Sequence, residues 1–254
     1  MSFTVVTTAF GDASLLPFFC EHYRRLGASR ILLCVNEGLG GAFLPPYDRD
    51  FVTEVHRTND SRGFGMHLTQ HELDAVARYC KKGDPVVFAD LDEFYEFPLG
   101  MRTHITELLT RTYDLVYGDF LDRVTIDGSL PRDLPPGLDL EGLNRLFPIG
   151  CYITRNVTKV CDRKVMLTRA GVKLSSGHHE VAQRGLKPAK HIRGVVHHFK
   201  WRGDVIERTK AVEQTSADEG RVGAFRAARL LSWLGDPPRV NVNDPVIEAR
   251  LVVR

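Results

Sequence analysis

The sequence predicts an α/β protein with an open, mainly parallel sheet, flanking helices and a C-terminal helical extension. Strand and helix patterns alternate through the first 95 residues, which is typical of a sheet wrapped by helices. Residues 85–89 form a short, wholly apolar run that suits an interior parallel strand. A chain of 254 residues can bury one continuous α/β core, so we expect a main domain over residues 1–203 and a separate C-terminal piece over residues 204–254.

The first elements are indicated by β-branched runs and helix end signals. Residues 3–8 are expected to form a strand, and a helix then begins near Ser14, has Pro17 in its first turn and ends at Gly27. The segments expected to follow are a strand at 30–35, a strand at 51–56, a helix at 67–80 and the apolar strand at 85–89.

The pattern changes after residue 90. The expected elements are a helix at 103–111, paired strands at 113–120 and 123–126, a loop at 130–142, strands at 164–168, 172–175 and 195–201, a helix from Asp204, a helix at about 222–234 and an extended tail from Asp236.

Composition narrows the functional class. Apolar residues make up 43%, charged residues 26%, and the net charge is +2, so no nucleic-acid partner is expected. The five scattered cysteines lack a C-x-x-C pair and are expected to be reduced thiols. No signal peptide or apolar window of about 18 residues is evident. We therefore expect a cytoplasmic protein without a transmembrane segment, and the sequence does not predict an oligomeric state.

The most informative segment is the apolar strand that ends in Asp90-Leu91-Asp92. Ligands of open α/β sheets bind at the carboxyl ends of strands, where these acids are placed. If the chain stays extended, both carboxylates point the same way, and their repulsion favours a shared divalent cation. A carboxylate-bound Mn²⁺ or Mg²⁺ would stabilise the diphosphate that leaves a sugar nucleotide. The alternative, an acid pair that caps a helix or pairs with Lys or Arg, has about equal weight for an isolated D-x-D motif.

Histidines later in the chain are candidates for the same chemistry. We predict that His198 completes the metal site and that His197 packs in the core, because neighbours on a strand face opposite ways. An imidazole ligand would favour Mn²⁺. Lys200 is a candidate to offset diphosphate charge.

Other clusters are candidates for acceptor and base. Gly177, His178 and His179 either contact the acceptor or form a polar loop. An inverting transferase needs a carboxylate base at the acceptor hydroxyl, and Asp119 and Asp122 are the candidates. Asp119 is preferred, because Asp122 has the alternative of a structural ion pair with a nearby arginine.

The donor nucleoside is expected at strand ends nearer the N-terminus. The candidates that would contact the donor are Thr7, Thr8, Ala9, Asn36, Arg62 and Leu91, together with Asp90, Asp92 and Lys200.

Three motifs give the chain a resemblance to glycosyltransferases of the GT-A fold, in particular to a small bacterial family-2-like group related to the family 92 transferases. They are residues 15–28, residues 88–94 and residues 197–201, and the similarity spans roughly residues 3–210. The resemblance implies a hexosyltransferase-type enzyme with a nucleotide-sugar donor, often UDP-linked, a divalent metal on Asp90 and Asp92, a late histidine ligand and inversion. It makes 1–95 the nucleotide-sugar-binding half and 96–203 the acceptor half. Asn36 stands where many such enzymes have an aspartate that holds the nucleoside.

Two other classes are open. An aspartate-dependent phosphatase also uses a strand ending in D-x-D, but Phe94 stands where that chemistry needs Thr or Val. A non-catalytic module that binds a nucleotide sugar or glycan would keep the same fold without turnover.

Overall fold

The computed structural model describes residues 2–10, 13–38, 44–59, 66–190, 192–203, 205–207, 209–210 and 222–252, with only the backbone for 222–225. Arg62 and Asp204 lie outside these residues. The chain divides into two compact units, a larger one of residues 1–119 and 163–196 and a smaller one of residues 120–162 and 197–254. This division differs from the boundary at residue 203 expected from the sequence.

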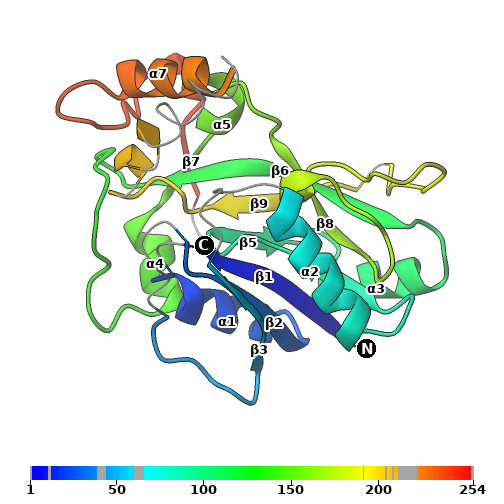
Figure 1. Cartoon of the computed structure of the whole chain (residues 1–254). Coiled ribbons are helices and arrows are strands. Elements are labelled where there is room, and N and C mark those ends of the chain that lie inside the picture. The colour runs from blue at the N-terminus through cyan, green and yellow to red at the C-terminus, as the bar shows by residue number, and fades with distance from the viewer. Residues whose placement is uncertain are drawn as a thin grey trace. The chain divides into compact units, whose positions relative to one another are not determined.

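The larger unit is an α/β sheet in which four neighbouring strands run parallel (Figure 1). Its order is β6-β8-β4-β1-β2-β3, with β8 antiparallel to both β4 and β6. The strands are β1 (Phe3–Phe10), β2 (Ala28–Asn36), β3 (Val52–Thr58), β4 (Pro85–Phe88), β8 (Arg163–Arg169) and the first part of β6 (Leu115–Val124). The expected α/β class, with an open sheet and flanking helices, is therefore confirmed at the coarse level, and the sheet that was expected to be mainly parallel is mixed.

Helices connect the parallel strands. They are α1 (Leu16–Arg25), between β1 and β2, and α2 (Met66–Tyr79), between β3 and β4. Right-handed crossovers that travel in opposite directions from the centre of a sheet place their helices on opposite faces. In Figure 1, α1 and α2 accordingly lie to either side of β1. Apolar residues of α2 pack with Val6 of β1, Leu32 of β2 and Phe88 of β4, so the carboxyl ends of these strands are held at one edge.

The remaining elements of the larger unit follow β4. They are β5 (Glu93–Glu96), α3 (Met101–Leu109), the 3-10 turn η1 (Ser176–His178) and the first part of β9 (Gly194–His198), a strand that pairs with β5 and β6. The expected strand at 172–175 is wrong, because only Leu174 makes an isolated bridge, to Val181.

The smaller unit is an antiparallel sheet with short helices. Its elements besides the ends of β6 and β9 are α4 (Leu140–Leu146), β7 (Ile149–Cys151), α5 (Ile153–Asn156), α7 (Val222–Leu234), η2 (Pro245–Ile247) and β10 (Arg250–Leu251). Strand β7 pairs with β6 on one side and β10 on the other. Its core joins Cys151 and Trp201 to Leu230 and Ile247, so the C-terminal segment shares one core with residues 120–162. This shared core is why the chain does not divide at residue 203.

Two predictions around β6 are wrong. The expected strands at 113–120 and 123–126 are one continuous strand, β6, within which the polar Asp122 is buried and hydrogen-bonded. The expected loop at 130–142 ends earlier, since α4 begins at Leu140 with Asp139 accepting a hydrogen bond from the Gly142 backbone N–H at 2.6 Å. None of the helices in the described residues is long and apolar enough to cross a bilayer.

Candidate functional site

The acidic motif lies in a turn at the carboxyl end of β4. The backbone N–H of Glu93 donates to the carbonyl of Asp90 at 2.9 Å, so the chain reverses between Asp90 and Asp92. Leu91 is 7% exposed and anchors the turn in the core. The expectation that the two carboxylates point the same way assumed an extended chain, and this condition is not met because the chain turns there. We call residues 90–93 the acidic turn.

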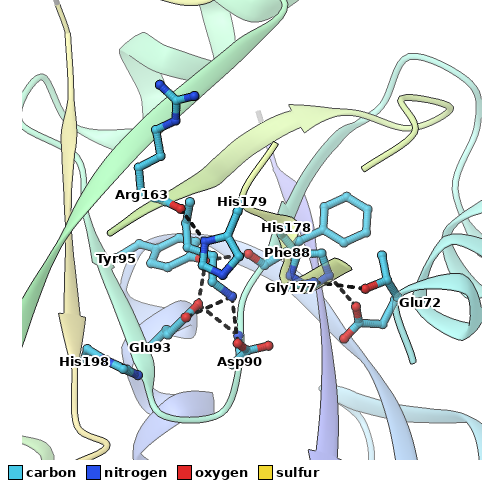
Figure 2. Close-up of polar contacts among 12 residues, drawn as sticks. Glu72, Phe88, Asp90, Glu93, Tyr95, Arg163, Gly177, His178, His179 and His198 are labelled. Atoms are coloured by element: carbon cyan, nitrogen blue, oxygen red, sulfur yellow. Dashed lines mark hydrogen bonds and ion pairs between the residues drawn. The ribbon is translucent and has the colours of Figure 1, made fainter. Parts of the chain in front are cut away.

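A buried lysine holds one side of the acidic turn, of which Asp90 and Glu93 are labelled in Figure 2. The Nζ atom of Lys164, on β8, lies 2.7 Å from Asp90 Oδ2 and 2.9 Å from Glu93 Oε1. The Lys164 and Glu93 side chains are each 1% exposed, and that of Asp90 is 24% exposed. Burial lowers the pKa of Lys164, but attraction by Asp90 and Glu93 outweighs this, and its pKa lies above the usual value. Lys164 is therefore an ammonium. It supplies the positive charge at Asp90 that we expected a metal ion to supply.

Two tyrosines complete the base of the acidic turn. The Tyr95 hydroxyl donates to the Phe88 carbonyl at 2.6 Å and lies 3.0 Å from Glu93 Oε2, while the Tyr23 hydroxyl donates to the Glu93 carbonyl at 3.1 Å. Burial and then the charge of Glu93 raise the pKa of both tyrosines, so both hydroxyls stay protonated and donate. The turn is thus fixed by hydrogen bonds as well as by charge.

The predicted nucleoside contacts lie at the ends of β1 and β2. The side chains of Thr7, Thr8, Ala9 and Asn36 are all buried. Thr8 donates to Glu72 Oε1 at 2.7 Å, and Asn36 Oδ1 accepts from the Gly38 backbone N–H at 3.0 Å. The side chains of Thr8 and Asn36 therefore already make hydrogen bonds inside the protein. Both residues lie at the carboxyl edge of the sheet, where the acidic turn also lies. Arg62, the other candidate in this group, lies outside the described residues.

The three residues predicted to contact an acceptor differ in position. His178 is 0% exposed and its Nε2 lies 2.5 Å from Glu72 Oε2, so the expectation of an acceptor contact at His178 is wrong in this conformation (Figure 2). Gly177 is also buried and has φ +66°, a left-handed conformation that favours glycine. His179 is half-buried and its Nδ1 donates to the Arg163 carbonyl at 2.7 Å. Burial and the charge of Lys164 lower the pKa of His179, which favours a neutral ring.

In the smaller unit, Asp122 is the centre of a buried polar cluster. Its Oδ1 accepts from Thr154 Oγ1 at 2.8 Å, from His198 Nδ1 at 2.9 Å and from Trp201 Nε1 at 2.8 Å, and its Oδ2 accepts from the Thr154 backbone N–H at 2.7 Å. Burial raises the pKa of Asp122, but these hydrogen bonds outweigh it and the pKa lies below the usual value. A base must reach an acceptor hydroxyl and take a proton, so the predicted role of Asp122 as catalytic base is wrong.

The contact with Asp122 defines the state of His198. An ionised carboxylate only accepts hydrogen bonds, so His198 Nδ1 carries a proton and donates. In a neutral ring the lone pair is then on Nε2. Histidines that bind metals commonly have this arrangement, in which a carboxylate orients the ring through the other nitrogen. The site chemistry of His198 thus fits the predicted ligand, with Asp122 as its positioning residue.

The remaining candidates are a core residue and two more exposed groups. His197 is 4% exposed, which confirms that it packs in the core, and burial and then the charge of Arg123 lower its pKa to about 3. Asp119 is 43% exposed, and its Oδ1 pairs with Arg193 at 2.6 Å. Lys200 is half-buried.

Sequence reasoning missed Glu93 and Lys164. Glu93 directly follows the motif, and the available signal for Lys164 was a lysine at the start of an otherwise apolar strand, Lys164-Val165-Met166-Leu167. Their pairing joins positions 71 residues apart, which no local pattern specifies. A comparison of the chain with protein-family models found no match, and a comparison with curated proteins found none either.

Proposed function

We propose that the protein is a metal-dependent glycosyltransferase of the GT-A fold that moves a sugar from a nucleotide-diphosphate donor, with UDP as the expected nucleotide, to a hydroxyl acceptor with inversion. The observation that carries this proposal is the place of the acidic turn. It follows β4, the neighbour of β1 in a parallel sheet whose order is β4-β1-β2-β3. The strand order reverses between β1 and β4, and ligands of open α/β sheets bind at such a point, outside the carboxyl ends of the strands.

The chemistry of the donor accounts for acids at this place. A departing nucleoside diphosphate carries negative charge, and a bound Mn²⁺ or Mg²⁺ supplies positive charge that stabilises it. Asp92 is the proposed carboxylate ligand, because Asp90 already pairs with Lys164. His198 is proposed as an imidazole ligand through Nε2, on the strength of its hydrogen bond to Asp122.

The proposed base is Asp119. It is the more exposed of the two carboxylates first considered, and a base must be able to reach the acceptor hydroxyl. Part of the contact between Arg193 and Asp119 would have to break when an acceptor hydroxyl approaches Asp119.

The donor site is tested by thermal unfolding with nucleoside diphosphates and Mn²⁺. A ligand present at about 100 times its dissociation constant stabilises a protein by about 2.7 kcal/mol, so UDP with Mn²⁺ should raise the melting temperature measurably. UDP without Mn²⁺ should have little effect. Asp92→Asn should lose the response, whereas Asp48→Asn, an exposed carboxylate that pairs with Arg24 in the same unit, should keep it. If no nucleoside diphosphate shifts the wild-type transition in the presence of Mn²⁺, the donor site is refuted.

Turnover separates an enzyme from a binding module of the same fold. A screen of nucleotide sugars for hydrolysis or transfer should reveal one donor that is consumed in the presence of Mn²⁺. Asp119→Asn should then lower the rate of transfer without lowering the thermal response to UDP and Mn²⁺. Binding without consumption of any donor would favour the non-catalytic alternative.

A further inference from the structure

Positive charge is concentrated in one segment of the larger unit. Residues 163–196 contain eight Lys or Arg residues, and Glu180 is the only acidic residue in this part of the sequence. The whole chain has a net charge of +2, so the rest of the chain is net negative. Charges of one sign that gather on one face produce a local potential that attracts partners of the opposite sign.

The sheet brings several ends of strands and loops together at one edge. Arg169, at the end of β8, is the register partner of Pro85, the first residue of β4. On the other side of β8, Thr168 pairs with Leu115 at the start of β6, and Leu115 makes an isolated bridge to Pro188. Neighbouring strands lie about 4.8 Å apart, so these four segments span only about 15 Å. This edge contains the amino end of β4 and is opposite the edge that carries the acidic turn.

Six exposed basic side chains lie on the loops at this edge. A Cβ on Gly171 would lie 3.6 Å from Lys82 Cγ, which places the loop before β4 against the loop after β8. The Leu108 carbonyl at the end of α3 accepts a hydrogen bond from Arg169 at 3.3 Å, which places the turn after α3 beside them. We call the six exposed residues the basic patch, and they are Lys81, Lys82, Arg111, Lys173, Lys187 and Lys190.

The acids at this edge hold the loops that carry the basic patch. Asp84 Oδ2 accepts from the Lys81 backbone N–H at 2.8 Å, and Asp114 Oδ2 accepts from the Lys187 backbone N–H, also at 2.8 Å. Asp114 also forms an ion pair with Arg169. Within the described part of the chain, none of the six side chains of the basic patch forms an ion pair. Their charge is therefore available to an external partner.

The composition of the basic patch favours a broad anionic surface over a nucleic acid. Five of its six residues are lysines, which are compact, flexible point charges without the fixed geometry of a guanidinium. Proteins that bind single-stranded nucleic acid stack bases on aromatic side chains, but none of the exposed large hydrophobic residues in the described ranges is aromatic. One of those residues, Leu109, is 46% exposed and directly follows Leu108 at this edge. An exposed leucine among lysines suits the interface of a lipid bilayer.

We propose that the basic patch docks the protein reversibly on membranes that contain anionic phospholipids, with Leu109 entering the interface. Clusters of about four to eight Lys or Arg residues bind such membranes, because each one near the surface increases the affinity about fivefold. The acidic turn lies at the other end of β4 and stays open to water in this orientation. Docking does not require glycosyl transfer, so the two activities are tested separately.

Vesicle co-sedimentation of the full chain tests the docking. Vesicles of phosphatidylcholine and phosphatidylserine in a three-to-one ratio should bind the protein, whereas vesicles of pure phosphatidylcholine should not. Salt at about 0.5 M should release the protein, because it screens charges over a shorter distance. A variant without four cations of the basic patch should bind at least about thirtyfold more weakly, which corresponds to two effective charges at about fivefold each. Its substitutions are Lys81→Gln, Lys82→Gln, Lys187→Gln and Lys190→Gln.

A matched control variant has the same net charge but keeps the basic patch. It replaces four exposed basic side chains of the smaller unit, and its vesicle affinity should stay within about threefold of wild type. Its substitutions are Arg145→Gln, Arg155→Gln, Lys159→Gln and Arg239→Gln. Equal losses in the two variants, or a wild-type protein that does not bind the phosphatidylserine vesicles, would overturn the proposal.

Replacement of Leu109 separates a lipid bilayer from other anionic partners. Leu109→Ser should weaken vesicle binding by about threefold or more and leave retention on heparin unchanged, because only the bilayer offers an apolar phase. An excess of soluble glycerophosphoserine should not displace the protein from vesicles. Unchanged vesicle binding by Leu109→Ser, displacement by glycerophosphoserine, or tighter binding to duplex DNA than to the vesicles would contradict membrane docking.

Thermal unfolding distinguishes this proposal from the proposed function. The four lysines replaced in the basic patch are exposed, so this variant should unfold at the wild-type temperature. It should also keep the wild-type response to UDP and Mn²⁺, because the basic patch and the acidic turn lie at opposite ends of β4. A protein that binds vesicles through the basic patch but binds no nucleoside diphosphate would refute the proposed function and leave membrane docking standing.

Discussion

Replacement of Asp122 by asparagine tests the buried cluster of the smaller unit. The carboxylate accepts four hydrogen bonds, three at Oδ1 and one at Oδ2. In Asp122→Asn the amide can keep an oxygen at the Oδ1 position, but its NH₂ group then faces the Thr154 backbone N–H. Two hydrogen-bond donors then face each other at the position where Oδ2 accepted from the Thr154 N–H. The three hydrogen bonds at Oδ1 are then made to a neutral acceptor in place of an ionised one.

The cost follows from these contacts. Losing a hydrogen bond to a buried charged acceptor costs about 1.5–3 kcal/mol, and bonds to a neutral acceptor are roughly half as strong as those to an ionised one. We expect Asp122→Asn to lower the free energy of unfolding of the smaller unit by about 2–4 kcal/mol. With a slope of about 2 kcal/mol per molar urea, the midpoint falls by about 1–2 M.

Urea unfolding followed by tryptophan fluorescence suits this measurement. The chain has two tryptophans, Trp201 and Trp233, and both belong to the smaller unit. The matched control is Asp244→Asn, because Asp244 also accepts from a tryptophan Nε1, that of Trp233 at 2.8 Å, but lies in a more exposed position. The control should stay within about 1 kcal/mol of wild type. A midpoint for Asp122→Asn equal to that of the control would refute the assignment of Asp122 as a buried acceptor.

Three further predictions concern pH, packing and the buried histidine of the larger unit. The pKa of His197 is about 3 in the folded protein and about 6.5 in the unfolded protein. The stabilisation that the neutral, buried ring gives to the folded protein is therefore fully present above pH 6.5 and is lost as pH falls toward 3. The stability difference between wild type and His197→Gln should therefore shrink between pH 7.5 and pH 5 in urea titrations, and a constant difference would contradict a buried neutral ring. Gly118→Ala should lower the free energy of unfolding by about 1–3 kcal/mol, because the added Cβ meets Met166 Sδ. In thermal unfolding experiments, adding Met166→Val to this variant should restore part of the lost stability. Glu72→Gln should cost about 1–3 kcal/mol, since Glu72 accepts from Thr8 and contacts His178 in a fully buried setting, and a change below about 0.5 kcal/mol would argue against that pairing.

Local sequence patterns were enough to predict the α/β class and the order of the first elements. Alternating β-branched runs and helix end signals depend on neighbours in the chain, so β1, α1, β2, β3, α2 and β4 were predicted close to their observed bounds. The place of Asp90 and Asp92 after an apolar strand was also local information. It was enough to put these acids at the carboxyl edge of the sheet.

The contacts of these acids, in contrast, depend on long-range packing. Lys164 reaches Asp90 from another strand, and Asp122 accepts hydrogen bonds from His198 and Trp201, which lie 76 and 79 residues further along the chain. From the sequence alone, a charged residue is interpreted as a surface group or as a ligand. Only the packed structure shows whether a buried partner neutralises its charge. The single strand β6 has the same origin, because partners far away in the chain satisfy the buried Asp122 in its middle. Long-range pairing of charges, which has no periodic signature, is therefore what separated the predicted site from the observed one.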